Sequence, residues 1–181
     1  MILNVIYVVL LVLVTAGAAV LSVLAWMRPT LTLAASAAGA AAAALLLAAV
    51  PTGQDPGFAV GALITLLALA AAVIGGGPVA TVALRLATRG SVAEGVHGGI
   101  IQDGGEVLRG GTAIGILERL AVAGVIIAGF PEGLAVIVAV KGVGRFSELD
   151  AAPARERFII GTFASLIWAA ACAGIALLAR G

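Results

Sequence analysis

The chain has 181 residues, of which 62% are hydrophobic and 10% are charged, and its formal net charge at pH 7 is +1. A soluble domain carries about 25% charged residues because its surface must be hydrated, so this composition excludes an ordinary soluble domain. It predicts one polytopic membrane domain. The near-neutral charge balance argues against a nucleic-acid-binding function.

The apolar residues form six runs separated by turn-forming or charged segments. We therefore predict an all-α integral membrane protein, a six-helix transmembrane bundle. The predicted spans are residues 2–26, 31–50, 58–77, 112–130, 132–147 and 157–178. The second run is dominated by alanine, which allows neighbouring backbones to approach closely. We expect this second helix to be packed inside the bundle rather than to face lipid.

The segment between the third and fourth spans is predicted to be a cytoplasmic loop, residues 78–111. The third span ends at Gly75-Gly76-Gly77-Pro78, residues that weaken a helix, so we expect a break there. Residues 78–89 then either extend the third helix or lie at the interface. Further on, Asp103-Gly104 separates two short β-friendly runs, a signal for a type I′ turn. The loop is predicted to form either a small β-hairpin or an irregular glycine-rich segment.

The distribution of cations predicts the orientation of the chain. With six spans, one side of the membrane receives seven arginines and the other receives Arg180 alone. The seven are Arg28, Arg85, Arg89, Arg109, Arg145, Arg155 and Arg157. Because cytoplasmic loops are enriched in Lys and Arg, we expect the seven-cation side to be cytoplasmic and both termini to be extracytoplasmic.

Two charged residues fall at matching depths in the fourth and fifth spans. Glu118 lies six residues after Thr112, and Lys141 lies six residues before Ser147, which places both roughly 9 Å below the cytoplasmic entry. The two spans are joined by a tight turn, so the helices are antiparallel neighbours. We predict an ion pair between Glu118 and Lys141, because a lone charge in the bilayer costs about 2.5–3.5 kcal/mol at the helix centre.

Other polar residues gather at the same end of the bundle. Arg119 points about 100° away from Glu118 and is expected to reach Glu148, the sixth helix or a lipid phosphate. The Arg109-Gly110-Gly111-Thr112 corner, with Thr112 as a candidate N-cap, combines a cation with free helix N–H groups. The candidate ligand-binding residues are Arg109, Thr112, Glu118, Arg119, Lys141, Arg145, Thr162 and Ser165. They predict either a binding site for a phosphate or lipid headgroup, or charges that only fix the helix register.

The sequence contains no recognisable catalytic or metal-binding motif. No P-loop, HExxH, GxSxG or paired-aspartate lipid transferase signature occurs. The single cysteine, Cys172, lies in an apolar run and is expected to be a packing residue, and the single histidine, His97, lies in a glycine-rich loop. We predict no catalytic residues, no metal and no cofactor, and an enzyme is the less favoured class.

Three segments, IGILERL (114–120), AVKGVGRFSEL (139–149) and ERFIIGTFAS (156–165), occur in an order that resembles an uncharacterised family of bacterial polytopic membrane proteins, a domain of unknown function. They cover about the C-terminal 40% of the chain. The resemblance implies a bacterial inner membrane location and brings no activity with it.

Two functions are consistent with these features. The first is a non-enzymatic scaffold or accessory subunit with a structural Glu118–Lys141 ion pair. The alternative is binding or transport of an anionic lipid or anion at the cytoplasmic-side cationic pocket. A chain of 181 residues would need a homodimer or a partner subunit to form a transport path. A proton relay through Glu118 is a third and weaker hypothesis.

Overall fold

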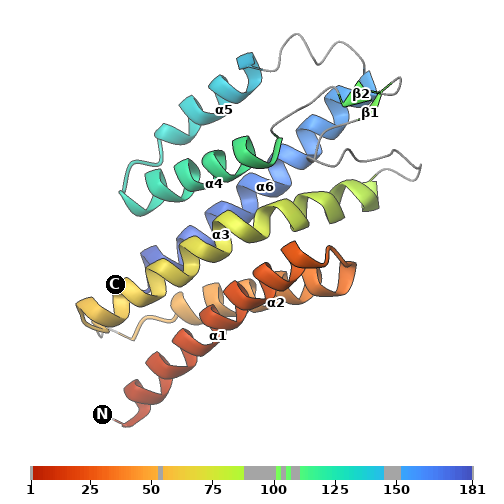
Figure 1. Cartoon of the computed structure of the whole chain (residues 1–181). Helices are drawn as coiled ribbons and strands as arrows, with labels where there is room; N and C mark the ends of the chain where they lie inside the picture. The colour runs from red at the N-terminus through yellow and green to blue at the C-terminus, as the bar shows by residue number, and fades with distance from the viewer. Residues whose placement is uncertain are drawn as a thin grey trace.

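The structure is a computed structural model that describes residues 2–52, 55–87, 101–102, 105–106, 111–144 and 152–180. This part of the chain contains six helices and two very short strands (Figure 1). The helices are α1 (Ile2–Met27), α2 (Leu31–Ala48), α3 (Phe58–Ala87), α4 (Gly111–Ile127), α5 (Gly133–Gly144) and α6 (Ala152–Leu178). The helical fold is the predicted class.

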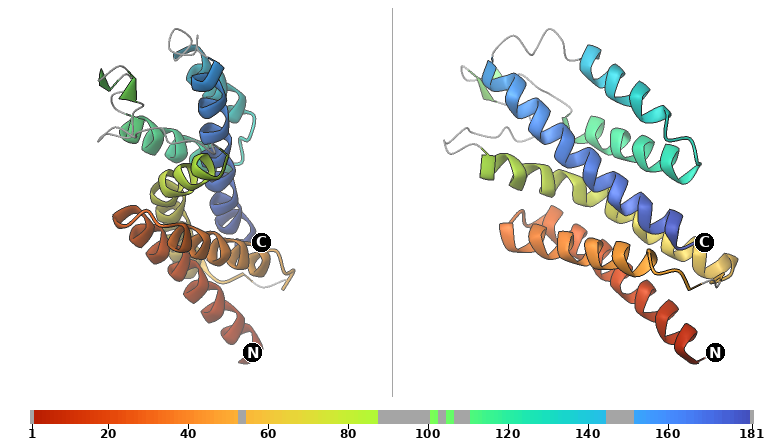
Figure 2. Two further views of the ribbon diagram at one scale, coloured as in Figure 1. Left: turned by 90° about the vertical axis from the view of Figure 1, so that its right-hand side faces the viewer. Right: turned by 180° about the vertical axis from the view of Figure 1, so that it is seen from behind.

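Helices α3 and α6 form the centre of the bundle. They run antiparallel and share the most extensive helix–helix contact (Figures 1 and 2). The α1–α2 pair packs on one side of this central pair, and α4 packs on the other side against both α3 and α6. Helix α5 lies outermost and makes its main contacts with α4. The bundle is therefore a layered arrangement whose two flanks are helical hairpins.

Four helices, α1, α2, α3 and the part of α6 from Arg155 to Leu178, are long and apolar enough to cross a membrane. Helices α4 and α5 have 17 and 12 residues. At 1.5 Å per residue they measure about 26 and 18 Å, against a hydrocarbon core of about 30 Å. The described part of the chain thus establishes four membrane-length helices, and the predicted fourth and fifth spans stay predictions.

The core of the bundle is built mainly from small residues. One buried cluster brings together alanines of α1, α2 and α3 with Val122 of α4 and with Trp168 and Cys172 of α6. Large apolar side chains instead lie on the outside, for example Leu13, Leu66 and Phe163. Small residues inside and large apolar residues outside are typical of helices that pack in lipid, where close backbone approach replaces the hydrophobic effect. Cys172 is a buried, free thiol in this core, as expected.

Helix α2 is peripheral, which corrects the prediction that it is packed inside the bundle. Its buried residues form a single stripe, with most of the others exposed or half-buried. The stripe consists of Ala34, Ala37, Ala41, Ala44 and Ala48. The 3–4 residue spacing lets one alanine face lie closely on α1 and also contact α3 and α6, and the opposite face, with Leu46 exposed, looks outward. Alanine content indicates close packing on one face and does not indicate burial on all faces.

Helix α3 continues without a break to Ala87, so the break expected at Gly75-Gly76-Gly77-Pro78 is wrong and residues 78–87 extend the third helix. The first ten residues of the predicted loop 78–111 are therefore helical. Pro78 lies inside the helix, where it removes one backbone N–H donor. Membrane helices tolerate such residues when neighbouring helices pack closely around them, and Trp168 and Arg119 pack on the glycines just before Pro78.

Two strands of two residues each, β1 (Ile101–Gln102) and β2 (Gly105–Glu106), pair antiparallel in the predicted hairpin segment. Ile101 lies opposite Glu106, and Gln102 lies opposite Gly105. Residues 103–104, 88–100 and 107–110 lie outside the described residues. A ladder of this length does not establish a folded hairpin, so the small β-hairpin stays a prediction.

The alanine stripe of α2 generates a test of the packing. Replacing Ala41, which is buried in the central cluster, by Leu inserts three extra carbons into a close helix contact. We expect Ala41→Leu to lower the free energy of unfolding by about 1–3 kcal/mol through overpacking. Ala42→Leu, on the exposed face of the same helix, should leave it nearly unchanged. Thermal unfolding in detergent measures both, and equal effects would contradict the assigned faces.

Candidate functional site

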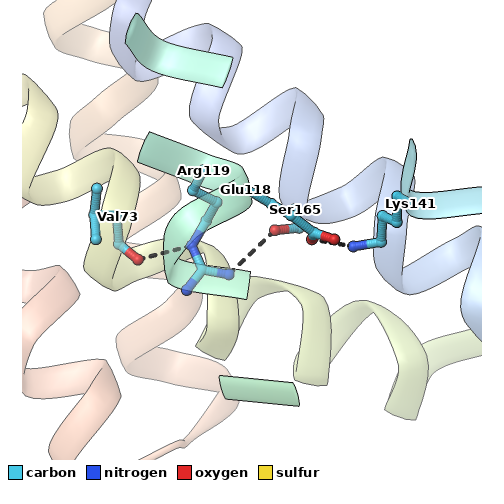
Figure 3. A network of polar contacts seen from close by, with 5 residues as sticks. All are labelled: Val73, Glu118, Arg119, Lys141 and Ser165. Atoms are coloured by element: carbon cyan, nitrogen blue, oxygen red, sulfur yellow. Dashed lines mark hydrogen bonds and ion pairs between the residues drawn. The ribbon is translucent and has the colours of Figure 1, made fainter. Parts of the chain in front are cut away.

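The buried cation Arg119 lies at the contact between α4 and the central helix pair. Its side chain is only 4% exposed. The Nε–H group donates to the backbone carbonyl oxygen of Val73 in α3 at 2.7 Å, and Nη1 donates to Oγ of Ser165 in α6 at 3.3 Å (Figure 3). One guanidinium group therefore joins three helices. Of the partners expected for Arg119, the sixth helix is contacted through Ser165, and Glu148 lies outside the described residues.

Glycines in two helices make room for this side chain. A Cβ atom at Gly76 of α3 would overlap Cδ of Arg119 and lie 2.9 Å from its Nε. A Cβ atom at Gly115, one turn before Arg119 in α4, would lie 3.0 Å from Nη1. The glycines next to Pro78 thus serve close approach rather than chain breaking.

The same stretch of α3 is fastened to α6 by Trp168. Its indole Nε1–H donates to the carbonyl oxygen of Ala71 at 2.9 Å, and the ring packs on Gly75. A Cβ at Gly75 would lie 2.5 Å from Cζ2 of Trp168 and 2.6 Å from Oγ of Ser22 in α1. Helices α1, α4 and α6 therefore all meet α3 at its triglycine segment.

The predicted pair of Glu118 and Lys141 is present. The Lys141 ammonium group donates to the Glu118 carboxylate across the α4–α5 contact (Figure 3). The two side chains are 12% and 16% exposed, so they are mostly withdrawn from the surface. Nζ of Lys141 also lies 5.8 Å from the centre of the Phe158 ring in α6, within the range of a cation–π contact. The pair therefore connects α5 both to α4 and to the beginning of α6.

The turn between α4 and α5 explains why the two residues meet. Helix α4 ends at Ile127, and Gly129 adopts a left-handed conformation with φ of +73°. The N–H group of Phe130 returns to the carbonyl oxygen of Val125 at 2.8 Å, which closes the helix end. Helix α5 then begins at Gly133, where a Cβ would lie 2.9 Å from Cγ1 of Val125. This tight reversal makes the helices antiparallel and brings Glu118 and Lys141 to the same level.

The structure brings together only some of the eight candidate residues. Glu118, Arg119, Lys141 and Ser165 come together in the network of Figure 3. Thr112 is exposed and lies at the second position of α4 instead of preceding it, and Thr162 is half-buried outside this network. Arg109 and Arg145 lie outside the described residues.

Sequence reasoning did not find the α3 side of the network. Val73 and Gly76 of α3 contact Arg119, and Trp168 of α6 contacts the triglycine segment of α3. None of the three was a candidate residue. The signal was available in Gly75-Gly76-Gly77, but these residues were interpreted as the end of a helix. A glycine cluster within an apolar run also indicates a close helix crossing.

The charged groups of the network bind one another or neutral oxygens of neighbouring helices. Within the described residues no group of three or more His, Cys, Asp or Glu side chains is placed to hold a metal ion. Arg119 donates to two neutral oxygens, and the Glu118 carboxylate accepts from Lys141. The arrangement is suited to holding helices together.

Comparison of the chain with protein-family models, curated proteins and solved structures found no match in any of the three. The resemblance to an uncharacterised bacterial membrane-protein family therefore stays a prediction.

The close approach at Gly76 generates a specific prediction. Gly76→Ala places a methyl group where Cδ of Arg119 lies, so Arg119 must give up its contacts with Val73 and Ser165. We expect a loss of about 1–3 kcal/mol in the free energy of unfolding, measured in detergent. The matched control is Gly61→Ala in the same helix, where an added Cβ meets nothing within 4 Å. That variant should be as stable as the wild type or slightly more stable.

Proposed function

We propose that this protein is a non-enzymatic scaffold or accessory subunit of the bacterial inner membrane, with a structural Glu118–Lys141 ion pair. The observation that carries the proposal is the use of the charged groups. Lys141 binds Glu118, and Arg119 binds Val73 and Ser165. These charges hold α4, α5 and the central helices together, so they are not presented to a substrate.

The position of α5 agrees with an accessory role. Helix α5 has a single buried residue, Gly133, and packs mainly on α4. Its outer surface is apolar, with Val136, Val140 and Val143 each more than half exposed. Such a surface suits lipid or a helix of another membrane protein. The ion pair with Glu118 therefore adds to the packing of the partly buried Leu134 and Ile137 in fixing the orientation of this short helix.

The proposed orientation places both termini outside the cytoplasm, and it does not depend on how deeply α4 and α5 enter the membrane. Because these helices form a hairpin, the start of α4 and the end of α5 face the same side whether the hairpin crosses the bilayer or turns back within it. Ile127, the last residue of α4, packs against the cluster that contains Ile64 and Ile175. These two residues lie near the start of α3 and near the end of α6, at the end of the bundle away from the proposed cytoplasmic side. This depth supports the six-span arrangement, although α5 by itself is short.

The alternative function, binding or transport of an anionic lipid or anion at the predicted cationic pocket, has less support at those residues. Arg119 and Lys141 already have partners within the protein. Arg109 and Arg145 lie outside the described residues. A homodimer or a membrane partner subunit would also be needed for a transport path.

A double-mutant cycle tests the structural role of the pair. Glu118→Gln leaves the Lys141 ammonium without a carboxylate, and Lys141→Met leaves the carboxylate without its cation. We expect each single change to cost about 2–3 kcal/mol of unfolding free energy, because an unpaired charge remains away from water. The double variant should recover most of this loss, since neither charge is left. A double variant as damaged as the worse single one would refute a structural role.

Cysteine labelling tests the proposed orientation. In a Cys172→Ala background, Thr52→Cys lies in the α2–α3 connection and Pro29→Cys lies in the α1–α2 connection. We expect a membrane-impermeant maleimide to label position 52 in intact cells and position 29 only after permeabilisation, because the arginine-rich side is cytoplasmic. The reversed pattern would overturn the orientation and leave the ion-pair experiment unaffected.

A further inference from the structure

Arg157 is a cation near the start of α6 that does not belong to the network around Arg119. It is the sixth residue of α6 and is half-buried. Its Nε and Nη1 atoms are covered by the protein and have no hydrogen-bond partner. In the described part of the chain these are the only buried side-chain nitrogen or oxygen atoms in this state. Arg157 is therefore a guanidinium group for which the described part of the chain supplies no acceptor at Nε or Nη1.

The position of Arg157 follows from the residues on its face of α6. Gly161 and Ser165 lie one and two turns further along, on the same face. A Cβ at Gly161 would lie 3.4 Å from Cδ1 of Leu84 in α3, and Ser165 accepts from Arg119. Arg157 thus lies on the face of α6 that packs on α3 and α4, one turn closer to the start of the helix.

This level corresponds to a membrane surface. The membrane-length part of α6 begins at Arg155, and Phe158-Ile159-Ile160 begin the apolar run directly after Arg157. A guanidinium at this point lies near the boundary between hydrocarbon and headgroups. Because Arg157 is only half-buried, a change of side-chain rotamer brings its donors out to the headgroup layer.

No carboxylate in the described part of the chain neutralises Arg157. Glu118 is bound by Lys141. Glu156 is exposed and adjacent in sequence, and consecutive residues of a helix point in different directions. A guanidinium with unpaired donors is costly where water is excluded, and it is stabilised by an anion that accepts two parallel hydrogen bonds.

We propose that Arg157 binds a phosphate group at the cytoplasmic membrane surface. The planar guanidinium fork matches the geometry of phosphate oxygens, and phosphate is the anion present at this depth. The phosphate belongs either to an anionic lipid headgroup or to free phosphate, and both offer the same oxygens. This site goes beyond the scaffold function, because holding helices together needs no ligand, and Arg157 is not one of the residues of the predicted pocket.

The experiment uses the full chain in three media: phosphate-free dodecyl maltoside micelles, the same micelles with phosphatidylglycerol added, and the same micelles with inorganic phosphate. Retained lipid is measured by native mass spectrometry, and the unfolding temperature is measured in each medium. Arg157→Gln is compared with Arg28→Gln, which removes the same charge from an exposed position at the end of α1 on the same proposed side.

We expect the wild type to retain phosphatidylglycerol and to be stabilised by it. Arg157→Gln should weaken this retention about tenfold, equivalent to about 1.4 kcal/mol, and Arg28→Gln should leave it unchanged. Stabilisation by inorganic phosphate alone would identify free phosphate as the source. In the micelles without phosphatidylglycerol or phosphate, Arg157→Gln should be at least as stable as the wild type, because it removes the unpartnered donors.

Three results would overturn the proposal. They are equal lipid and phosphate responses of Arg157→Gln and the wild type, an equal loss in Arg28→Gln, or a destabilised Arg157→Gln in the micelles without lipid or phosphate. If Arg157→Gln does not fold, Arg157→Lys decides the question. It keeps the charge but loses the fork, so it should bind several-fold more weakly, and unchanged binding would refute phosphate recognition by Arg157. The Glu118→Gln, Lys141→Met double variant should retain binding, which separates this site from the scaffold proposal.

Discussion

The packing of this bundle depends on how closely the other helices can approach the middle of α3. Between Ala71 and Gly77, α3 offers two carbonyl oxygens to side chains of other helices and carries no side chain larger than hydrogen at its three glycines. Trp168 of α6 and Arg119 of α4 use this space to reach those oxygens. In lipid there is no water to bind these polar groups, so each must find a partner within the protein.

The buried charges of α4 and α5 are used to orient helices. Arg119 distributes its hydrogen bonds over α3 and α6, and Glu118, its neighbour in sequence, faces α5 and binds Lys141. Two consecutive residues thus connect one helix to neighbours on different sides, because they are separated by about 100° around the axis. A charge placed in this way specifies one helix arrangement, since any other arrangement leaves it unpaired in a medium of low dielectric constant. Arg157 differs because its buried Nε and Nη1 atoms have no acceptor in the described part of the chain, and this observation is the basis of the proposed phosphate site.

The two flanks of the bundle are held in different ways. Helix α2 lies on α1 through a stripe of alanines, so its attachment depends on close van der Waals contact over most of its length. Helix α5 is short and buries Gly133 alone; it is held by the tight turn at Gly129, by one ion pair and by the partly buried Leu134 and Ile137, which pack against the central cluster. The first flank is therefore fixed by shape, and the second combines charge with a smaller apolar contact.

The sequence by itself determined the membrane-type helical fold and the pairing of Glu118 with Lys141, because length, hydrophobicity and the spacing of residues from a tight turn are local properties of the chain. It also indicated that Cys172 is a packing residue. Only the tertiary structure decided that α3 continues through Pro78, that α2 is peripheral, and that Arg119 binds Val73 and Ser165. Glycine and proline weaken an isolated helix, and alanine favours close contact on any face, so their effect here depends on which neighbours pack against them. Those neighbours are far away in the sequence, and their positions are set only when the whole bundle assembles.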